Sequence, residues 1–290
     1  MFDTVKNLLS EQGIDLSAPI SLLDCTVKRS YLLERHKIGL GGSAIIFAIP
    51  YHSLACEDES RNISRYAVGR DYHRFIKDLA DTLIPTLETR FPTTHFALFS
   101  DHSPIDEREA AAKAGLGIIG RNGLLITKPF SSYVFLGEIV TDKPLPQHLR
   151  HIREIEYCEN CGACLSACPF AQKQIGECLS ALTQKKGMLT ANEERAIVEY
   201  GSAWGCDICQ EVCPHTKAAA KQGTLTSPIS YFTKETLSHL TYDGIREMSE
   251  RDFSERAFAW RGREVILRNL AALERERDNK EASTSDTEKP

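Results

Sequence analysis

Cysteine spacing constrains this chain more than any other feature of its sequence. Eight of the ten cysteines fall within residues 158–213, seven of them in two groups and one between the groups. The first group, "CENCGACLSACP", has the spacing C-x2-C-x2-C-x3-C-P, and Cys178 stands alone ten residues after its last cysteine. The second group, "CDICQEVCP", begins at Cys206 and contains three cysteines. Thiols this closely spaced force the backbone to wrap around whatever they bind, so they indicate a metal centre.

Composition indicates the environment in which those thiols act. The 290-residue chain has a formal net charge of −5, and no apolar run approaches the roughly 20 residues that a membrane span needs. Its first residues, "MFDTVKNLLSEQGID", include acids and lack a continuous apolar block, so we expect no secretory signal. We therefore expect a soluble, cytoplasmic protein without a membrane partner, in which cysteines stay reduced and bind metal. The negative charge gives no general support for nucleic-acid binding.

Iron–sulfur clusters explain the uneven distribution of the eight thiols. In the bacterial ferredoxin run, three cysteines bind one [4Fe–4S] cluster and the fourth binds the other. Aligning the second group on the first leaves Ala203 where the first group has Cys158, so one ligand is missing, and Cys178 supplies it. The spacing therefore predicts two ligand sets. The first set is Cys158, Cys161, Cys164 and Cys213, and the second set is Cys168, Cys178, Cys206 and Cys209.

Two other interpretations of these thiols stay open. The eight cysteines could hold two zinc ions, although four-thiolate zinc sites usually pair C-x2-C units without the x3-C-P ending. They could also form a double-cluster module that stores electrons and performs no chemistry of its own. Cys25 and Cys56 stand outside the pattern, and we expect ordinary thiols at both positions.

Hydrophobic periodicity divides the rest of the chain into a mixed N-terminal half and a helical C-terminal part. Before residue 150 it predicts strands in "AIIFAIP", "THFALFS", "NGLLIT" and "YVFLGEIVT", and helices in residues 71–90 and "DEREAAAKAG". This alternation predicts an α/β or α+β domain over residues 1–150. After the cysteine-rich segment, 151–220, we expect helices over 221–275 and a polar, disordered tail over 276–290.

Three short motifs in the N-terminal half are candidates for chemistry. "GLGIIG" matches the dinucleotide fingerprint but follows an expected helix and precedes a strand, so we interpret it as a glycine turn. "DYH", ending at His73, begins like a cobalamin-ligand motif, yet Ile76 replaces the required glycine. Asp101 in "SDHSPIDER" is either the N-cap of the next helix or a catalytic acid. His102 and Asp106 fit surface or capping roles better.

Five stretches of the chain, in order, are similar to one protein family. They are "ISRYAVGRDYH" (63–73), "DHSPIDEREAAAKAGLGIIGRNGLLI" (101–126), "SSYVFLGEIVTDKPL" (131–145), "YCENCGACLSACP" and "WGCDICQEVCP". Together they resemble the epoxyqueuosine reductases, which remove the epoxide oxygen from epoxyqueuosine in tRNA with cobalamin and two [4Fe–4S] clusters. The resemblance implies an α+β fold: a nitroreductase-like cobalamin-binding α/β domain, then a ferredoxin-like double-cluster domain and a short helical C-terminus.

The resemblance also implies roles for individual residues. Asp101 occupies the position of the family's proposed proton donor, and cobalamin binds without a lower histidine ligand, in agreement with the incomplete "DYH" motif. The cobalamin-binding positions are Tyr66, Asp101, Asn122, Leu125, Ser132 and Asp207. There are four departures from the family pattern. Ile118 replaces an aromatic residue, the linker from Cys168 to Cys178 is shorter, and "DHSP" replaces the usual small residues after the aspartate. The chain also resembles a short form without the family's full C-terminal helical-repeat segment.

The sequence therefore predicts a corrinoid iron–sulfur reductase that acts on epoxyqueuosine in tRNA. We expect an external electron donor such as a flavodoxin or ferredoxin. The alternatives are a reductase of a small molecule, for example in reductive dehalogenation, and a non-catalytic electron-transfer module. Arg261, Arg263 and Arg268 in the last helix are candidates for phosphate contacts, although solvated charges on a capping helix are the simpler interpretation.

Overall fold

The protein is described by a computed structural model that covers residues 1–173 and 178–287. The chain forms two compact units, each built from several stretches. Unit 1 comprises Met1–His52, Tyr72–Cys164 and Gln210–Tyr231, and unit 2 comprises Ser53–Asp71, Leu165–Cys209 and Phe232–Pro290. Because both units are discontinuous, neither coincides with the linear boundaries expected at residues 150 and 220. The division of function along the chain therefore stays a prediction.

Unit 1 is built on an antiparallel sheet with the strand order β1-β2-β6-β3. Its strands are β1 (Leu16–Ser21), β2 (Ser43–Pro50), β3 (Phe96–Phe99) and β6 (Val134–Thr141), and a second sheet pairs β4 (Gly117–Ile119) with β5 (Leu125–Thr127). The central strand β2 is buried along its whole length, as its continuous apolar run predicts. Strands are thus confirmed in all four predicted stretches. The sequence did not predict β1, an edge strand that contains Pro19 and polar residues.

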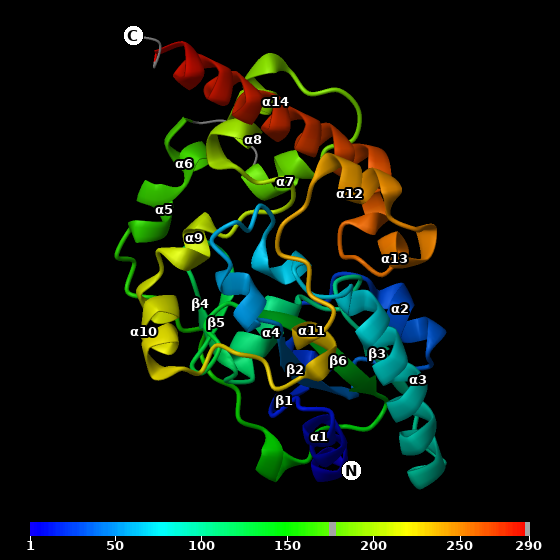
Figure 1. Ribbon diagram of the computed structural model, residues 1–290. Coiled ribbons are helices and arrows are strands. Elements are labelled where there is room, and N and C mark those ends of the chain that lie inside the picture. The colour runs from blue at the N-terminus through cyan, green and yellow to red at the C-terminus, as the bar shows by residue number, and fades with distance from the viewer. Residues whose placement is uncertain (174–177, 288–290) are drawn as a thin grey trace. The chain divides into compact units, whose positions relative to one another are not determined.

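Helices pack against this sheet (Figure 1). α4 (Glu107–Lys113) contacts β1, β2 and β6, α3 (Tyr72–Arg90) contacts β3, and α1 (Phe2–Glu11) contacts β1. The three alanines of "EREAAAK" join Ile46, Leu125 and Val140 in the core between α4 and the sheet. Other helices wholly or partly in unit 1 are α2 (Ser30–Arg35), α5 (Ala163–Ala167), α9 (Ile208–Glu211), α10 (Pro214–Gln222) and α11 (Ser230–Thr233).

The "GLGIIG" sequence forms the connection from α4 into β4, which confirms its interpretation as a glycine turn. A Cβ atom on Gly117 would lie 2.3 Å from the carbonyl oxygen of Ile126, so β4 and β5 approach each other more closely than any side chain would allow. A helix precedes this sequence and strand β4 lies within it, whereas the dinucleotide-binding arrangement has a strand before the glycines and a helix after them.

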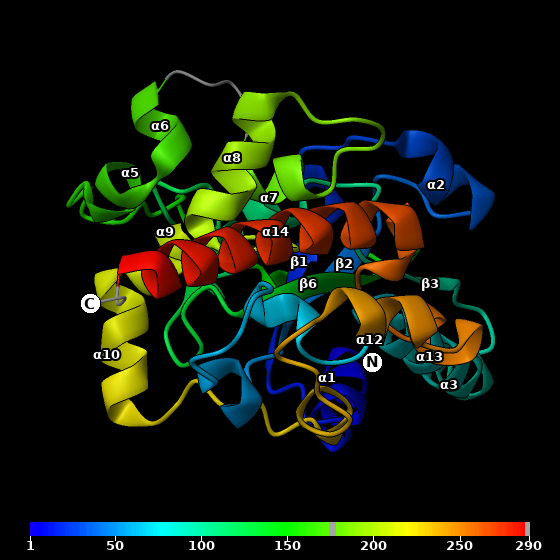
Figure 2. The ribbon, with the colours of Figure 1, turned by 45° about the horizontal axis from the view of Figure 1, so that its top comes forward.

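Unit 2 is helical, and its long helix α14 (Arg263–Thr287) packs against α7 (Leu179–Thr183), α8 (Ala191–Tyr200) and α12 (Tyr242–Glu247) (Figure 2). α6 (Pro169–Lys173) and α13 (Glu250–Ser254) complete its α-helices among the described residues. The buried Asn269 of α14 donates to the carbonyl oxygens of Thr183 and Ala203, at 2.7 and 2.8 Å. In the part of the chain described, no helix is both long and apolar enough to cross a membrane.

The predicted disordered tail is mostly helical, which corrects that expectation. α14 continues through Thr287, and only residues 288–290 of the tail lie outside the described residues. The sequence "ERERDNKEA" is polar, but glutamate, arginine, lysine and alanine are all strong helix formers. Polarity alone therefore misled the prediction, because a helix that is already anchored can be extended by residues of high helix propensity.

Candidate active site and cluster-binding cysteines

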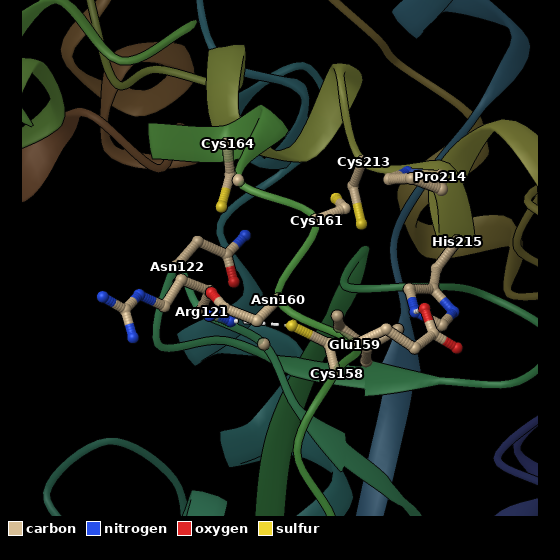
Figure 3. A pocket seen from close by; sticks show the side chains of 13 residues that line it. Arg121, Asn122, Cys158, Glu159, Asn160, Cys161, Cys164, Cys213, Pro214 and His215 are labelled. Atoms are coloured by element: carbon tan, nitrogen blue, oxygen red, sulfur yellow. Dashed lines mark hydrogen bonds and ion pairs between the residues drawn. The ribbon is translucent and has the colours of Figure 1, made fainter. Parts of the chain in front are cut away.

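The predicted first set of thiols lines a single pocket in unit 1 (Figure 3). Its members are Cys158, Cys161, Cys164 and Cys213. Cys164 lies on α5, and Cys213 is the N-cap of α10, so segments far apart in sequence contribute to one site. Asn160 and Gly162 have φ angles of 54° and 79°, which turn the backbone sharply around the pocket. The structure thus brings together the four cysteines of the first set.

The surroundings of this pocket favour a negatively charged occupant. The backbone N–H of Arg121 donates to Cys158 Sγ at 3.3 Å. The N-terminus of α10 begins at Cys213, and the partial positive charge of a helix N-terminus stabilises anions. Asn122, predicted to contact cobalamin, also lines this pocket. N–H groups aimed at cysteine sulfur are among the features that tune the reduction potential of a bound cluster.

All four cysteines of the predicted second set belong to unit 2. Cys168 and Cys206 pack on an apolar cluster that includes Leu179 and Ile197, and Cys178 is the N-cap of α7. Burial raises the pKa of the Cys206 thiol to about 12, and the nearby Cys178 and Cys209 act in the same direction. Cys178, Cys206 and Cys209 are therefore neighbours. Residues 174–177, in the linker between Cys168 and Cys178, lie outside the described residues.

Asp101 lies in the turn between β3 and α4, and it does not cap the helix. Its φ angle of 61° is in the left-handed region, which residues with side chains rarely adopt. The Tyr72 hydroxyl donates to Asp101 Oδ2, and His73 Nε2 lies 3.3 Å from the same oxygen. The Asp101 side chain is 59% exposed. Its carboxyl is therefore accessible and flanked by two groups that can carry a proton.

Asp106 is the N-cap of α4, because its side chain accepts from the backbone N–H of Glu109 at 3.2 Å. The capping interpretation of Asp101 is therefore wrong, and the capping role expected for Asp106 is confirmed. The reason is local: "HSPI" forms a turn after Asp101, so the helix begins five residues later than a direct cap would require. His102 is exposed and pairs with the Tyr31 hydroxyl at 2.9 Å.

Asp207, predicted to face cobalamin, is bonded to other parts of unit 2. Its side chain is only 2% exposed. Ser64 Oγ donates to Oδ1 at 2.6 Å, the backbone N–H of Arg65 donates to Oδ2 at 2.7 Å, and the Arg61 guanidinium donates to Oδ2 at 3.0 Å. Burial raises the pKa of Asp207, and these partners act in the opposite direction. The carboxyl ties residues 61–65 to the segment that carries Cys206 and Cys209.

The other predicted cobalamin contacts make protein contacts of their own. Trp204 Nε1 donates to the Tyr66 hydroxyl at 2.7 Å, within unit 2. In unit 1, Leu125 is buried in the core, and the buried Ser132 donates to Gln210 Oε1 at 2.9 Å. Of these three side chains, those of Leu125 and Ser132 are enclosed by protein.

Two of the three arginines that are candidates for phosphate contacts, Arg263 and Arg268, are bonded to other protein groups instead of being solvated. Arg263 lies 2.7 Å from a Glu250 carboxylate oxygen and over the Phe253 ring. Arg268 donates to the carbonyl oxygen of Lys185 at 2.8 Å. Arg261 stacks on Trp260 with its guanidinium carbon 3.8 Å from the ring centroid. The simpler interpretation of solvated charges is therefore wrong for Arg263 and Arg268.

Sequence reasoning missed four residues that the structure places around Asp101. Tyr72 and His73 contact its carboxyl. Both belong to the "DYH" motif, but that motif indicates a cobalt ligand and gives no sign of a contact with Asp101. Glu107 and Glu138 lie near the turn that carries Asp101. Burial is the main cause that raises the pKa of both carboxyls, and the pKa of Glu107 is raised to about 7. The sequence shows that Glu138 lies within the apolar strand "YVFLGEIVT", but no pattern in it indicates that Glu107 is its neighbour.

Comparisons with known proteins account for both parts of the chain. Residues 41–102 match the family model described as "Epoxyqueuosine reductase QueG, DUF1730", and residues 157–216 match a "4Fe-4S double cluster binding domain". The epoxyqueuosine reductase of Gloeobacter violaceus is 32% identical over 219 residues, which cover 73% of this chain and 68% of that protein. The chain belongs to the epoxyqueuosine reductase family. All eight cysteines of the two sets fall inside the double-cluster match, so iron–sulfur clusters account for them and zinc does not.

Other epoxyqueuosine reductases are similar to this chain in sequence and in fold. The one from Pseudomonas aeruginosa is 33% identical over 222 residues, which cover 74% of this chain but only 58% of that protein. A crystal structure of epoxyqueuosine reductase with an epoxyqueuosine-modified tRNA stem loop has a TM-score of 0.71 at 22% identity, and covers 94% of this chain and 81% of that one. This chain thus has the fold of the epoxyqueuosine reductases.

Proposed function

We propose that this chain reduces epoxyqueuosine to queuosine in tRNA. One observation carries the proposal: a member of the epoxyqueuosine reductase family combines a double-cluster domain with an exposed carboxyl, Asp101, flanked by two possible proton carriers. A related reductase was crystallised with an epoxyqueuosine-modified tRNA stem loop, which supports this substrate.

The chain uses two [4Fe–4S] clusters and cobalamin. We assign the first cluster to Cys158, Cys161, Cys164 and Cys213, and the second to Cys168, Cys178, Cys206 and Cys209. The residues present fit a cluster at the first set, because four thiol side chains line one pocket and the Arg121 N–H already donates to one of the sulfur atoms. When bound, the clusters and cobalamin supply the electrons of the reduction.

We assign cobalamin to a nitroreductase-like domain in the N-terminal half and the clusters to a ferredoxin-like domain. Asp101 is exposed and Asn122 lines a pocket, which supports a direct contact of both side chains with cobalamin. Leu125 and Ser132 are enclosed by protein, so they act by shaping the wall of the site, and Tyr66 and Asp207 act by holding residues 61–66 in place. His73 contacts Asp101, which supports cobalamin binding without a histidine ligand from "DYH".

The residues around Asp101 provide the protons. Removing an epoxide oxygen as water consumes two electrons and two protons and leaves a carbon–carbon double bond. Asp101 gives the first of those protons to the departing oxygen and, after taking a further proton from solvent by way of His73, gives the second as water forms. The Tyr72 hydroxyl fixes the orientation of the carboxyl, and the His73 imidazole, 3.3 Å from Oδ2, returns a proton after turnover. General acid catalysis of this kind contributes about 10²–10⁴-fold to a rate.

The partners follow from this reaction. The enzyme acts on tRNA in the cytoplasm and receives electrons from an external donor such as a flavodoxin or ferredoxin. Because the chain has a net charge of −5, tRNA recognition relies on local basic groups and on the modified base. Arg261 is a better candidate for a phosphate contact than Arg263 or Arg268, both of which already have protein partners.

An assay on natural substrate tests the proposal. The protein is purified anaerobically with cobalamin and incubated with reductant and tRNA from cells that lack their own reductase. Nucleoside mass spectrometry after digestion should show epoxyqueuosine replaced by queuosine. Reduction of an organohalide without conversion of the tRNA would instead favour a small-molecule reductase. Failure to bind cobalamin, together with reversible cluster reduction, would favour an electron-transfer module.

A further inference from the structure

A basic segment runs beside the turn that carries Asp101. Residues 28–37, "KRSYLLERHK", contain four lysine or arginine side chains and one acid, Glu34, in a chain whose net charge is −5. The segment includes α2, and both the segment and the turn belong to unit 1. A local basic patch of this kind is the electrostatic feature that nucleic-acid binding requires, even where the chain as a whole is acidic.

The start of this basic segment is hydrogen-bonded to the residues that follow Asp101. The backbone N–H groups of Lys28 and Arg29 both donate to the carbonyl oxygen of Pro104, at 2.8 and 3.1 Å. The Arg29 guanidinium donates to the carbonyl oxygen of Ser103 at 3.0 Å. The Arg29 side chain is therefore used within the protein, and it fixes the segment against one side of the Asp101 turn.

The end of the basic segment packs against the strand that leads to Asp101. The His36 ring lies edge-on to the Phe99 ring, with the two centroids 5.6 Å apart. Phe99 is the last residue of β3, two positions before Asp101. Arg35 and Lys37 are the sequence neighbours of His36, so this contact places both beside the start of the turn. The pKa of His36 is lowered by burial and by Arg35, so its ring is neutral at neutral pH.

Two cations of the segment are available to a ligand. Arg35 and Lys37 are exposed, and within the described residues neither side chain has a hydrogen bond or an ion pair. Lys28 is 50% exposed and lies 3.4 Å from a carboxylate oxygen of Asp106. Glu34 is the one acid of the segment, so it offsets only one of the positive charges. The surface therefore keeps an excess of positive charge next to the turn.

The proposed substrate brings phosphates to this surface. Each nucleotide of a tRNA carries one phosphate charge, so a modified base that reaches Asp101 brings the phosphates on either side of it close to the turn. A carboxylate repels those phosphates, and cations beside it offset the repulsion. Lysine and arginine contacts to phosphates also fix the register of a nucleic acid without reading its sequence. A tRNA backbone therefore matches both the charge and the place of the segment.

We propose that Arg35 and Lys37, supported by Lys28, bind the tRNA phosphates that flank the modified nucleotide and so bring its base to Asp101. The inference rests on the proposed function, because it takes tRNA as the substrate and Asp101 as the proton donor. It adds a tRNA-binding surface in unit 1 to the candidate phosphate contact of Arg261 in unit 2.

Matched amide substitutions test the contact. The probe is an RNA stem loop that carries epoxyqueuosine, and its affinity for the loaded enzyme is measured by fluorescence anisotropy over a range of salt concentrations. Arg35→Gln and Lys37→Gln should each weaken binding. Each should also reduce the slope of log K against log salt by about 0.7–0.9, the contribution of one phosphate contact. Arg35→Lys should keep the wild-type slope, because it keeps the charge.

Lys6→Gln is the control for a general loss of positive charge. Lys6 is exposed on α1, which contacts β1 at the edge of the sheet opposite to β3, so this variant should keep the wild-type affinity and slope. An unchanged slope in both Arg35→Gln and Lys37→Gln, or an equal change in Lys6→Gln, would overturn the inference and leave tRNA as the substrate. If the wild type does not bind the stem loop, the proposed function fails, and the inference fails with it.

A cross-linking measurement keeps the inference testable if a variant does not fold. The wild-type enzyme is bound to the same stem loop and irradiated with ultraviolet light, and the linked peptides are identified by mass spectrometry. Nucleotides next to the modified base should be linked to residues 28–37. Cross-links found only at other surfaces of the protein would overturn the proposal.

Discussion

The two units each contain an aspartate that the sequence associates with the cofactor, and the two side chains are held in opposite ways. Asp101 of unit 1 is 59% exposed on a left-handed turn, and its carboxyl contacts Tyr72 and His73. Asp207 of unit 2 is 2% exposed and is bonded to Ser64, a backbone N–H and an arginine. An exposed acid beside proton carriers can react, whereas a buried acid beside guanidinium groups holds backbone segments together. We therefore assign catalysis to Asp101 and construction of the cluster site to Asp207.

The largest effect is expected at the second set of cysteines, which includes the two that flank Asp207. Cys178→Ala removes one ligand of the second set only, so anaerobically reconstituted protein should hold about four irons per chain where the wild type holds about eight. Turnover should be lost, because electrons no longer reach the site. Iron analysis and the visible spectrum measure the change. Cys25→Ala, outside both sets, should keep the wild-type iron content, and loss of all iron from Cys178→Ala would contradict two independent ligand sets.

Replacing the buried Asp207 should strongly lower the free energy of unfolding. In Asp207→Ala the guanidinium groups of Arg61 and Arg65, 15% and 11% exposed, lose the carboxylate that compensates their charge. Breaking a buried ion pair from one side costs about 3–5 kcal/mol. Anaerobic denaturant unfolding measures the loss. Asp101→Ala is the matched control, and its exposed carboxyl should contribute about 1 kcal/mol or less. Similar losses in the two variants would remove the distinction between the aspartates.

A smaller effect is expected at the hydroxyl that orients Asp101. Tyr72→Phe removes one hydrogen bond to Oδ2 and keeps the ring that stacks on Phe135. A bond of this kind is worth about 1 kcal/mol, so single-turnover reduction should slow by roughly fivefold. Tyr31→Phe is the control, because its hydroxyl contacts His102 in the same turn but not Asp101. Equal rates in the two variants would show that Tyr72 does not orient the acid.

The division of the eight cysteines into two ligand sets stays a prediction. Their place in a double-cluster domain could be predicted, because cysteine spacing is a local property of the chain. The same is true of the buried strand β2 and the alanine-rich helix α4, whose patterns are contained in a few residues. Contacts between distant residues could not be predicted. Tyr72 meets Asp101 only because α3 lies beside β3, and Glu138 meets Glu107 only because β6 pairs between β2 and β3 beneath α4.

The partners of Asp207 could not be predicted either, because they are distant from it in the sequence. Its position between two cysteines suggested a contact with the cofactor, whereas Ser64 and Arg61 bind it across more than 140 residues of sequence. Burial is decided by tertiary packing, and no local pattern in "CDICQ" distinguishes a buried acid from an exposed one. A charged residue in a short motif is therefore a weak indication of its role until its partners are known.

The most direct test of the account is single-turnover reduction of epoxyqueuosine tRNA by Asp101→Asn, with iron, cobalamin and visible spectra measured on the same sample. Asparagine keeps the shape of the side chain but has no acidic proton to give. We predict that both clusters and cobalamin stay bound and become reduced as in the wild type, while conversion of the tRNA slows by about 10²–10⁴-fold. Conversion at the wild-type rate would contradict the assignment of Asp101 as the proton donor.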